Sequence, residues 1–208
     1  MSSAPANISK GIFIVLEGID GSGKTTIAKA LAESLSKRGF KALYTYEPTD
    51  SDIALAIRGK YRGLRDPYID SLAFALDRLI HLKLEVEPAL SRGFVVISDR
   101  YLYSSVAYQS ACGAPADWIL EINKWALKPD IALYLDVSPE EAIARKRGTL
   151  SRFPEFEEIL LLRKVREKYL WMVEKGLLIS VNASRGIIEV YKDVERLVNH
   201  EIDRRTTS

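Results

Sequence analysis

Short apolar runs alternate with longer stretches of mixed polarity along this chain. Four of the five apolar runs are almost uninterrupted, which is typical of strands covered on both faces of a sheet. The expected strands are Ile12–Leu16, Lys41–Tyr46, Phe94–Ser98, Ile131–Asp136 and Leu177–Val181. The intervening stretches have the length of helices. The expected helices are Thr25–Arg38, Ile53–Tyr61, Ile69–Arg92, Asp117–Leu127, Glu140–Arg147, Phe156–Lys175 and Ile187–Arg204.

Strands that alternate with helices predict parallel pairing through crossover helices. We therefore expect an α/β fold of three layers, in which a five-stranded parallel sheet is flanked by helices. The length of 208 residues suits a single domain over 1–208, and the small, polar residues 1–10 are expected to form a loose tail.

The composition narrows the class of protein. A hydrophobic fraction of 47% and a charged fraction of 28% are those of a globular domain, and the net charge of +2 predicts no nucleic-acid partner. The apolar runs are too short to cross a bilayer, so we expect no membrane partner. The single cysteine, Cys112, and the lack of an apolar leader indicate a reducing, cytoplasmic setting.

A glycine-rich motif follows the first expected strand and opens the first expected helix. Its eight residues match G-x-x-x-x-G-K-[ST], the phosphate-binding loop of P-loop NTPases. The glycines let backbone amides face phosphates, the lysine supplies a charge for the β- and γ-phosphates, and the threonine hydroxyl suits Mg²⁺. The expected ATP-binding residues of this segment are Gly18, Ile19, Asp20, Gly21, Ser22, Gly23, Lys24, Thr25 and Thr26.

Two classes of protein use such a loop, phosphotransferases and nucleotide-switched binding proteins. A guanine-dependent switch is expected to carry Asn-Lys-x-Asp, but the chain has only Asn123-Lys124-Trp125-Ala126. The phosphotransferase class is therefore favoured.

Candidate acceptor residues lie in three other segments. Asp99 and Arg100 follow the third strand, where a carboxylate can hold Mg²⁺ and a guanidinium can clamp a phosphate. Phe74 and Arg78 lie four residues apart on one helix face, which suits a planar base with carbonyl oxygens. His81, on the same face, is expected to pack at the edge of this site. Basic residues around a Gly-Thr-Leu-Ser break indicate a lid over 145–156 that closes on the phosphates.

With these segments in place, the sequence resembles the thymidylate kinases, a family of nucleoside-monophosphate kinases. The resemblance extends from about Ile12 to Val194. It is carried by Glu17-Gly18 to Thr26, Glu47-Pro48, Phe74-x-x-x-Arg78, Asp99-Arg100-Tyr101 with Ser104, Ala107-Tyr108-Gln109, Lys128-Pro129-Asp130 and Leu135-Asp136-Val137.

The resemblance implies the transfer of the γ-phosphoryl group of ATP to dTMP, with Mg²⁺, in dTTP biosynthesis, by a homodimer. It implies that Asp20 meets the deoxyribose 3′-hydroxyl, Arg100 and Arg58 hold the dTMP phosphate, and Phe74 stacks on thymine. By the same resemblance Arg78 bonds the thymine O4, and Tyr108 crowds a ribose 2′-hydroxyl. Further residues implied are Glu47, Ser105 and Gln109 for the acceptor, Thr25 and Asp99 for the metal, and Asn182 and Ala183 near adenine.

Some positions depart from the family pattern. Gly21 stands where some members have a basic residue, so the catalytic arginine is expected from the lid, with Arg145, Arg147 and Arg152 as candidates beside Lys24 and Arg100. Tyr46-Glu47-Pro48-Thr49 replaces Arg-Glu-Pro-Gly, Pro154 replaces a common Glu, and Asn182-Ala183 replaces Asp-Ala.

The acceptor phosphate oxygen is already anionic, so the reaction needs no general base and rests on positioning and charge neutralisation. Two alternatives stay open at this point. One is a UMP or AMP kinase on the same fold, and the other is a nucleotide-dependent binding protein that retains the fold.

Overall fold

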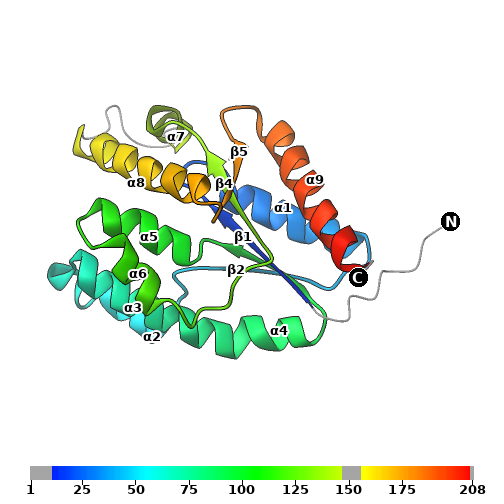
Figure 1. The fold of residues 1–208 in the computed structure, drawn as a ribbon, viewed down its shortest axis with the longest axis horizontal. Helices are drawn as coiled ribbons and strands as arrows, with labels where there is room; N and C mark the ends of the chain where they lie inside the picture. Colours follow the sequence, from blue (N-terminus) through cyan, green and yellow to red (C-terminus); the bar gives the residue numbers. More distant parts are fainter. Residues whose placement is uncertain (1–10, 147–155, 207–208) are drawn as a thin grey trace.

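One parallel sheet runs through the computed structural model, which describes residues 11–146 and 156–206 (Figure 1). Its five strands lie in the order β2-β3-β1-β4-β5, and every neighbouring pair is parallel. The strands are β1 (Ile12–Glu17), β2 (Ala42–Tyr46), β3 (Val95–Asp99), β4 (Ile131–Asp136) and β5 (Ile179–Asn182). The α/β class and the parallel sheet predicted from the sequence are confirmed.

Helices cover both faces of this sheet and make the three layers. Helices α1 and α9 lie on one face, and α4, α5 and α8 lie on the other (Figure 1). The helices are α1 (Lys24–Lys37), α2 (Asp52–Arg58), α3 (Pro67–His81), α4 (Glu87–Ser91), α5 (Leu102–Ala111), α6 (Ala116–Ile122), α7 (Pro139–Lys146), α8 (Phe156–Glu174) and α9 (Ile187–Thr206), with a 3₁₀ turn η1 (Arg62–Leu64) and a π-helical turn η2 (Leu82–Val86).

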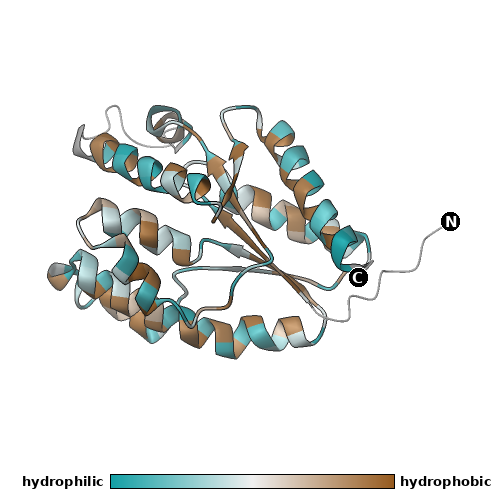
Figure 2. Ribbon diagram, in the orientation of Figure 1, coloured by the Kyte–Doolittle hydropathy of each residue, from teal (hydrophilic) through white to brown (hydrophobic). Residues whose placement is uncertain are grey.

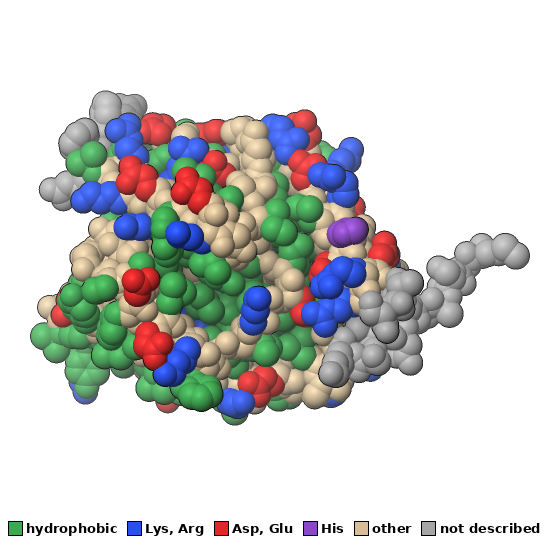
Figure 3. Space-filling model, viewed as in Figure 1, with side chains coloured by type: hydrophobic (Ala, Val, Ile, Leu, Met, Phe, Trp, Pro, Cys, Tyr) green, Lys and Arg blue, Asp and Glu red, His purple; other side chains and the backbone are tan. Residues whose placement is uncertain are grey.

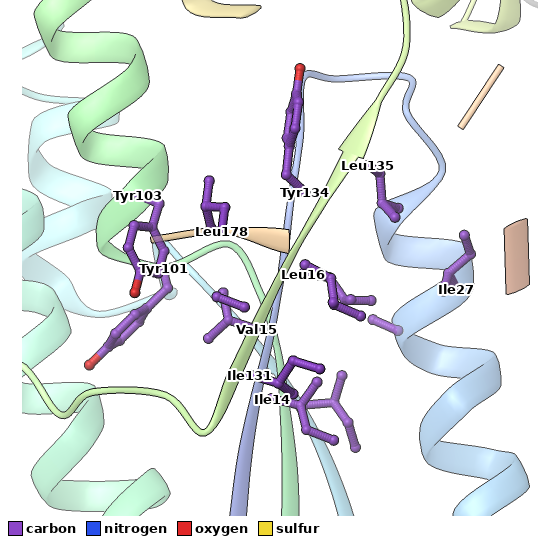
Figure 4. Close-up of a cluster of buried hydrophobic side chains, with 14 of the residues drawn as sticks. Ile14, Val15, Leu16, Ile27, Tyr101, Tyr103, Ile131, Tyr134, Leu135 and Leu178 are labelled. Atoms are coloured by element: carbon purple, nitrogen blue, oxygen red, sulfur yellow. The ribbon is translucent and has the colours of Figure 1, made fainter. Parts of the chain in front are cut away.

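The central strand β1 is buried along its whole length. Its side chains alternate between the faces: Leu16 points toward Ile27 of α1, whereas Val15 points toward Tyr103 at the start of α5 (Figure 4). In Figure 2 the central strands are mainly brown, the colour of hydrophobic residues, whereas the helices combine apolar and polar residues. A strand that is apolar on both sides is stable only between two layers of helix, as the sequence pattern indicated.

Helix α5 is the one α-helix of the described chain that the sequence analysis did not foresee. Its tyrosine, serine and valine residues have modest helix propensity. The first turn is stabilised from outside, since the Glu17 carboxylate accepts hydrogen bonds from the amides of Tyr101 and Ser104 at 2.9 and 3.1 Å. A helix held by a tertiary contact leaves little signal in its own sequence.

Other element bounds differ by a few residues. Helix α3 begins earlier than expected because Asp66 caps it, accepting from the amides of Tyr68 and Ile69 at 2.8 and 2.7 Å. The helix expected over Asp117–Leu127 ends at Ile122, where the side chain of Asn123 accepts a hydrogen bond from Arg78. The helix expected over Ile69–Arg92 is a continuous path of α3, η2 and α4.

The register of the sheet brings its carboxyl ends to one edge. Leu16 and Tyr46 both lie beside Asp99, and Glu17 lies beside Tyr134. Loops that follow parallel strands converge at such an edge. None of the helices in the described part of the chain is long and apolar enough to span a membrane.

Candidate active site

The loop after β1 has the backbone of a phosphate cradle. Gly18, Gly21 and Gly23 have φ angles of 152°, 91° and 92°, in the region that favours glycine. A Cβ at Gly21 would lie 2.2 Å from the carbonyl oxygen of Ala142 in α7. The loop ends at Gly23, which caps the N-terminus of α1, and there the backbone amides and the helix dipole favour an anion.

Lys24 lies at that N-terminus with only 5% of its surface exposed. Its Nζ donates to the Ile19 carbonyl at 3.3 Å and to Asp20 Oδ1 at 3.5 Å. Burial, helped by the positive charge of Arg100, lowers the pKa of Lys24 to about 8, so the ammonium is still mainly charged at neutral pH. A buried cation in a glycine loop is suited to neutralising phosphate oxygens.

Thr25 and Asp99 meet beside the loop, as the sequence analysis expected for a metal site. The Thr25 hydroxyl donates to Asp99 Oδ2, and Asp99 Oδ1 is buried with no hydrogen-bond partner in the described chain. One carboxylate and one hydroxyl fit Mg²⁺, which takes few protein ligands and completes its shell with water and phosphate oxygens. Residues 11–146 and 156–206 contain no group of three His, Cys, Asp or Glu side chains that could hold a metal ion by themselves.

A cavity of about 280 Å³ opens next to the phosphate loop. It is formed where the ends of β2 and β3 meet helices α2, α3 and α5. All nine residues expected at the acceptor line it, namely Asp20, Glu47, Arg58, Phe74, Arg78, Arg100, Ser105, Tyr108 and Gln109. The structure adds Pro48, Arg65, Tyr101 and Ser104. Four guanidinium groups in one small cavity indicate an anionic ligand.

Arg100 lies between the phosphate loop and the cavity. Its φ of 73° is the one positive value outside glycine in the described chain, and its amide donates to the Leu16 carbonyl at 2.9 Å. The guanidinium donates to Asp20 and, at 2.9 Å, to Ser104 Oγ, and it lies 5.0 Å from the centre of the Tyr108 ring. Strained backbone of this kind is tolerated where surrounding contacts fix it, as in functional sites.

Arg78 lies at the deep end of the cavity and is 2% exposed. Its Nε donates to Glu47 Oε2 at 2.7 Å, and its two terminal nitrogens donate to Asn123 Oδ1 and Ser105 Oγ. Each terminal nitrogen keeps a second N–H, because a guanidinium has five donors. This part of the cavity therefore offers fixed donors to a ligand with carbonyl oxygens.

Phe74 and Gln109 complete the wall around Arg78. Phe74 is half-buried on α3, one turn before Arg78. The Gln109 carbonyl oxygen is buried and has no hydrogen-bond partner in the described residues. An aromatic face, donors from Arg78 and an acceptor from Gln109 are the groups that a flat heterocycle with C=O and N–H edges requires.

Two more arginines line the mouth of the cavity. Arg58 donates to the carbonyl oxygens of Ala54, at 3.2 Å, and Thr49. Arg65, which the sequence analysis did not single out, forms a two-point ion pair with Asp70 at 2.7 and 2.9 Å. In the sequence it is one of several basic residues after α2, which is a pattern that a solvent-exposed surface also gives.

A second cavity of about 400 Å³ lies on the other side of the phosphate loop. It is lined by Gly21, Gly23, Thr26, Arg145, Arg185, Gly186 and Ile187. Arg145 is held there by Glu141 at 2.6 Å and by the Arg185 carbonyl at 3.3 Å. An apolar side chain and two guanidinium groups beside a phosphate loop suit the base and phosphates of a nucleotide donor.

The residues that the sequence analysis expected near adenine lie just before those that line the second cavity. Asn182 and Ala183 do not line the second cavity, because the Asn182 side chain accepts from the amide and hydroxyl of Ser184 and Ala183 is fully buried. The turn that they form presents Arg185, Gly186 and Ile187 instead. The candidate lid residues Arg147 and Arg152 lie outside the described residues.

A family model and several curated proteins match this chain over most of its length. The thymidylate kinase family model matches residues 16–194. Among curated proteins, a probable thymidylate kinase of Staphylothermus marinus is 52% identical over 190 residues, which cover 91% of this chain and 96% of that protein. Probable thymidylate kinases of Pyrococcus abyssi and Pyrobaculum calidifontis are 46% and 41% identical, covering 93% and 90% of this chain and 98% and 95% of those proteins.

Proposed function

The chain belongs to the thymidylate kinase family, and from that premise we propose how its two cavities transfer the γ-phosphoryl group of ATP to dTMP. It is a phosphotransferase whose acceptor is itself a phosphate group. The observation that carries the assignment of the site is the position of Asp20 and Arg100. Asp20 belongs to the phosphate loop, yet both side chains line the acceptor cavity, so donor and acceptor phosphates would meet at this point.

The reaction requires charge neutralisation more than activation of a nucleophile. The attacking oxygen of dTMP is anionic, and no side chain has to remove a proton from it. Lys24 would offset charge on the β- and γ-phosphates, and Arg100 and Arg58 would hold the dTMP phosphate. Buried, pre-positioned cations lower the barrier because they need no reorganisation during the transfer.

The base end of the cavity supports a pyrimidine with two carbonyl groups. The remaining N–H groups of Arg78 would donate to O4, the unpartnered Gln109 oxygen would accept from N3–H, and Phe74 would stack on the ring. Ser105 lies beside Arg78, and Tyr108 would stand next to C2′, where a ribose hydroxyl would be crowded. Asp20 would meet the 3′-hydroxyl. A purine monophosphate would have to fit the same 280 Å³.

Magnesium is proposed on the residues that fit it. Thr25 and the unpartnered oxygen of Asp99 would hold the ion or its waters. When bound, Mg²⁺ would supply positive charge that offsets the negative charge of the phosphate groups.

The arginine that closes on the transferring phosphoryl group is proposed to come from the lid. Gly21 allows no side chain at the loop position without displacing α7. Arg145, Arg147 and Arg152 remain the candidates; of these, Arg145 lies at the donor cavity in the structure. A single domain with a lid over 145–156, and a cytoplasmic location, also remain predictions from the sequence.

A homodimer is proposed from the family resemblance together with one surface of the structure. Tyr68, Leu72 and Leu76 recur every four residues on α3, and 48%, 55% and 49% of their surfaces are exposed. Figure 3 shows hydrophobic side chains gathered over the region of α3 and α6. We name Tyr68, Leu72 and Leu76 the α3 stripe. An apolar stripe of this length on a surface helix suits burial against a second copy.

The acceptor assignment is tested by ADP release with ATP, Mg²⁺ and a panel of dTMP, dUMP, dCMP, UMP and AMP. We expect dTMP to be the preferred acceptor. Equal rates with dCMP or AMP would contradict the roles of Phe74 and Arg78, because neither base offers the same carbonyl pattern. Hydrolysis of ATP without phosphorylation of any monophosphate would favour a nucleotide-dependent binding protein instead.

The phosphate-loop assignment is tested by Lys24→Ala. We expect turnover to fall by roughly 100- to 1,000-fold, since a pre-positioned charge on the transferring group is lost. Lys29→Ala is the matched control, because Lys29 lies on the same helix with its side chain exposed. Circular dichroism should be unchanged in both variants. Near wild-type turnover in Lys24→Ala would contradict the mechanism.

A further inference from the structure

A buried chain of polar groups lies behind the base end of the acceptor cavity and is not accounted for by the mechanism above. Its centre is His81, the last residue of α3, whose side chain is 3% exposed. The His81 Nδ1 lies 3.1 Å from Glu47 Oε1, and its Nε2 lies 2.7 Å from Thr45 Oγ1 and 3.0 Å from Glu85 Oε2. The imidazole is therefore in contact with a carboxylate at each nitrogen.

The number of hydrogens available to the two carboxylates favours a charged ring. A neutral imidazole has a single N–H. If that hydrogen is on Nδ1, the Nε2 lone pair faces the Glu85 carboxylate. The Thr45 hydroxyl, whose Oγ1 lies 2.8 Å from Glu85 Oε2, has one hydrogen and can donate it either to Nε2 or to Glu85. If the hydrogen is on Nε2, the Nδ1 lone pair faces Glu47. Only the imidazolium supplies a donor to both carboxylates.

The electrostatic surroundings agree with the hydrogen count. Burial disfavours a charge on His81, but the carboxylates of Glu47, at the end of β2, and Glu85, in η2, outweigh it and raise the pKa of His81 above its usual value. Two further charged side chains lie one turn earlier on α3: Arg78, which pairs with Glu47, and Asp77, whose buried carboxylate accepts from the hydroxyls of Thr49 and Ser51. Within the set of Glu85, His81, Glu47 and Arg78, two positive and two negative charges balance when His81 is protonated; with His81 neutral, one negative charge of that set is in excess.

Glu47 connects this histidine to the acceptor site. Its Oε1 contacts His81, and its Oε2 accepts from Arg78 Nε at 2.7 Å. Both the Glu47 and the Arg78 side chains are 3% exposed, so their contact is shielded from bulk water. The position of the Arg78 guanidinium therefore depends on a carboxylate that His81 shares. The π-helical turn that carries Glu85 begins directly after His81, and turns of this kind are frequent at functional sites.

We propose that His81 is a positioning residue that acts as an imidazolium, through Glu47, on the base-reading Arg78, and thereby makes the affinity for the acceptor nucleotide depend on pH. The proposal rests on the proposed function for the identity of the nucleotide. It concerns a chain of ion pairs that runs from Glu85 through His81 and Glu47 to Arg78, which we call the relay. Glu85 is half exposed, and Arg78 lines the cavity. Loss of the ring proton should loosen the relay and weaken acceptor binding.

The protonation state is tested without activity, by long-range ¹H–¹⁵N NMR of the ring nitrogens. The chain has only two histidines, and the second, His200, is exposed on α9. His81→Gln assigns the two sets of signals. We expect both nitrogens of His81 to be protonated at pH 7 and its pKa to lie above the usual value of a histidine. A His81 ring that is neutral at pH 7 would overturn the proposal.

The coupling to the acceptor is tested by the KM for dTMP as a function of pH. In the wild type this KM should rise as the pH increases through the titration of His81. His81→Gln should raise the KM for dTMP by roughly 3- to 30-fold and remove that inflection, with the KM for ATP unchanged. Titration of the dTMP phosphate is common to all variants and does not affect their comparison.

Two variants separate the relay from a general effect on folding. Glu85→Gln removes one carboxylate beside the ring, so the inflection should move to lower pH; the partial exposure of Glu85 makes this variant easy to accommodate. His200→Gln should leave the profile unchanged. An unchanged inflection in Glu85→Gln, or equal changes in both KM values in His81→Gln, would overturn the proposal. A wild type that does not phosphorylate dTMP would contradict the proposed function instead, and the NMR measurement would still decide the state of His81.

Discussion

At the scale of single residues, Glu17 joins parts of the chain that are far apart in sequence. It ends β1, is fully buried, and accepts four hydrogen bonds. Two come from the amides that begin α5, and the others come from the hydroxyls of Ser104 at 2.6 Å and Tyr169 at 2.9 Å. One carboxylate thus holds together β1, α5 and α8. Removing it would leave several buried donors without an acceptor.

The burial of Glu17 has a consequence for stability as a function of pH. Despite its four donors, burial raises the pKa of Glu17 from 4.5 to about 7. Between these values the folded protein retains a proton that the unfolded chain releases, so stability falls as the pH rises through this window, by roughly 3 kcal/mol. Denaturant unfolding at pH 5 and pH 8 measures this effect.

Glu17→Gln provides the comparison for that measurement, since the amide does not titrate. We expect the variant to be less stable than the wild type at pH 5. The difference between the two should shrink by pH 8. A difference that stays constant across the window would mean that Glu17 is ionised throughout, and that the four donors outweigh burial.

At the scale of elements, the contact between the phosphate loop and α7 restricts what the loop can carry. Gly21 has a φ of 91°, and its hydrogen faces the Ala142 carbonyl. The sequence prediction that no catalytic side chain comes from this position therefore has a steric reason. Any residue larger than glycine would have to move α7, whose C-terminal end overlaps the expected lid.

Gly21→Ala is the corresponding prediction. The Cβ would add both a clash and the backbone strain of a positive φ, which costs about 1–2 kcal/mol by itself. We expect the KM for ATP to increase roughly tenfold or more, with a smaller effect on dTMP. Gly63→Ala is the matched control, since a Cβ there has no atom within 4 Å. Equal KM values in the two variants would contradict a role for the contact.

The elements also show which parts of the fold and the site could be predicted. The five strands and the phosphate loop were predictable because buried parallel strands and glycine turns have local sequence patterns. The nine acceptor residues came from motif resemblance, and the structure places them around one cavity. Helix α5 was missed because its first turn depends on Glu17, and Arg65 was missed because nothing in its own segment distinguishes it from a surface arginine.

At the scale of the whole molecule, the α3 stripe is the surface on which we expect two copies of the chain to meet. Leu72 is at its centre and is 55% exposed. If two copies meet there, Leu72→Glu would bury a charge without a partner, at a cost of several kcal/mol. We expect sedimentation equilibrium to show a dimer for the wild type and a dissociation constant at least 100-fold higher for the variant.

Leu160→Glu is the control for the dissociation expected of Leu72→Glu. Leu160 is 40% exposed on α8, away from the α3 stripe, so its substitution should leave the dimer intact. A monomeric wild type, or dissociation by both substitutions alike, would contradict an interface on α3. Activity measured at the same concentrations would show whether the acceptor cavity depends on the second copy.

The Glu17 contacts also make an evolutionary prediction. Glu17 Oε2 accepts from the hydroxyls of both Ser104 and Tyr169, so a change at Glu17 removes their shared acceptor, and a change at Ser104 or Tyr169 removes one of the two side-chain donors to a buried carboxylate. Single substitutions should therefore be selected against more strongly than combined ones. Across an alignment of relatives, the three positions should either stay the same or change together, although 152 positions separate the first from the last.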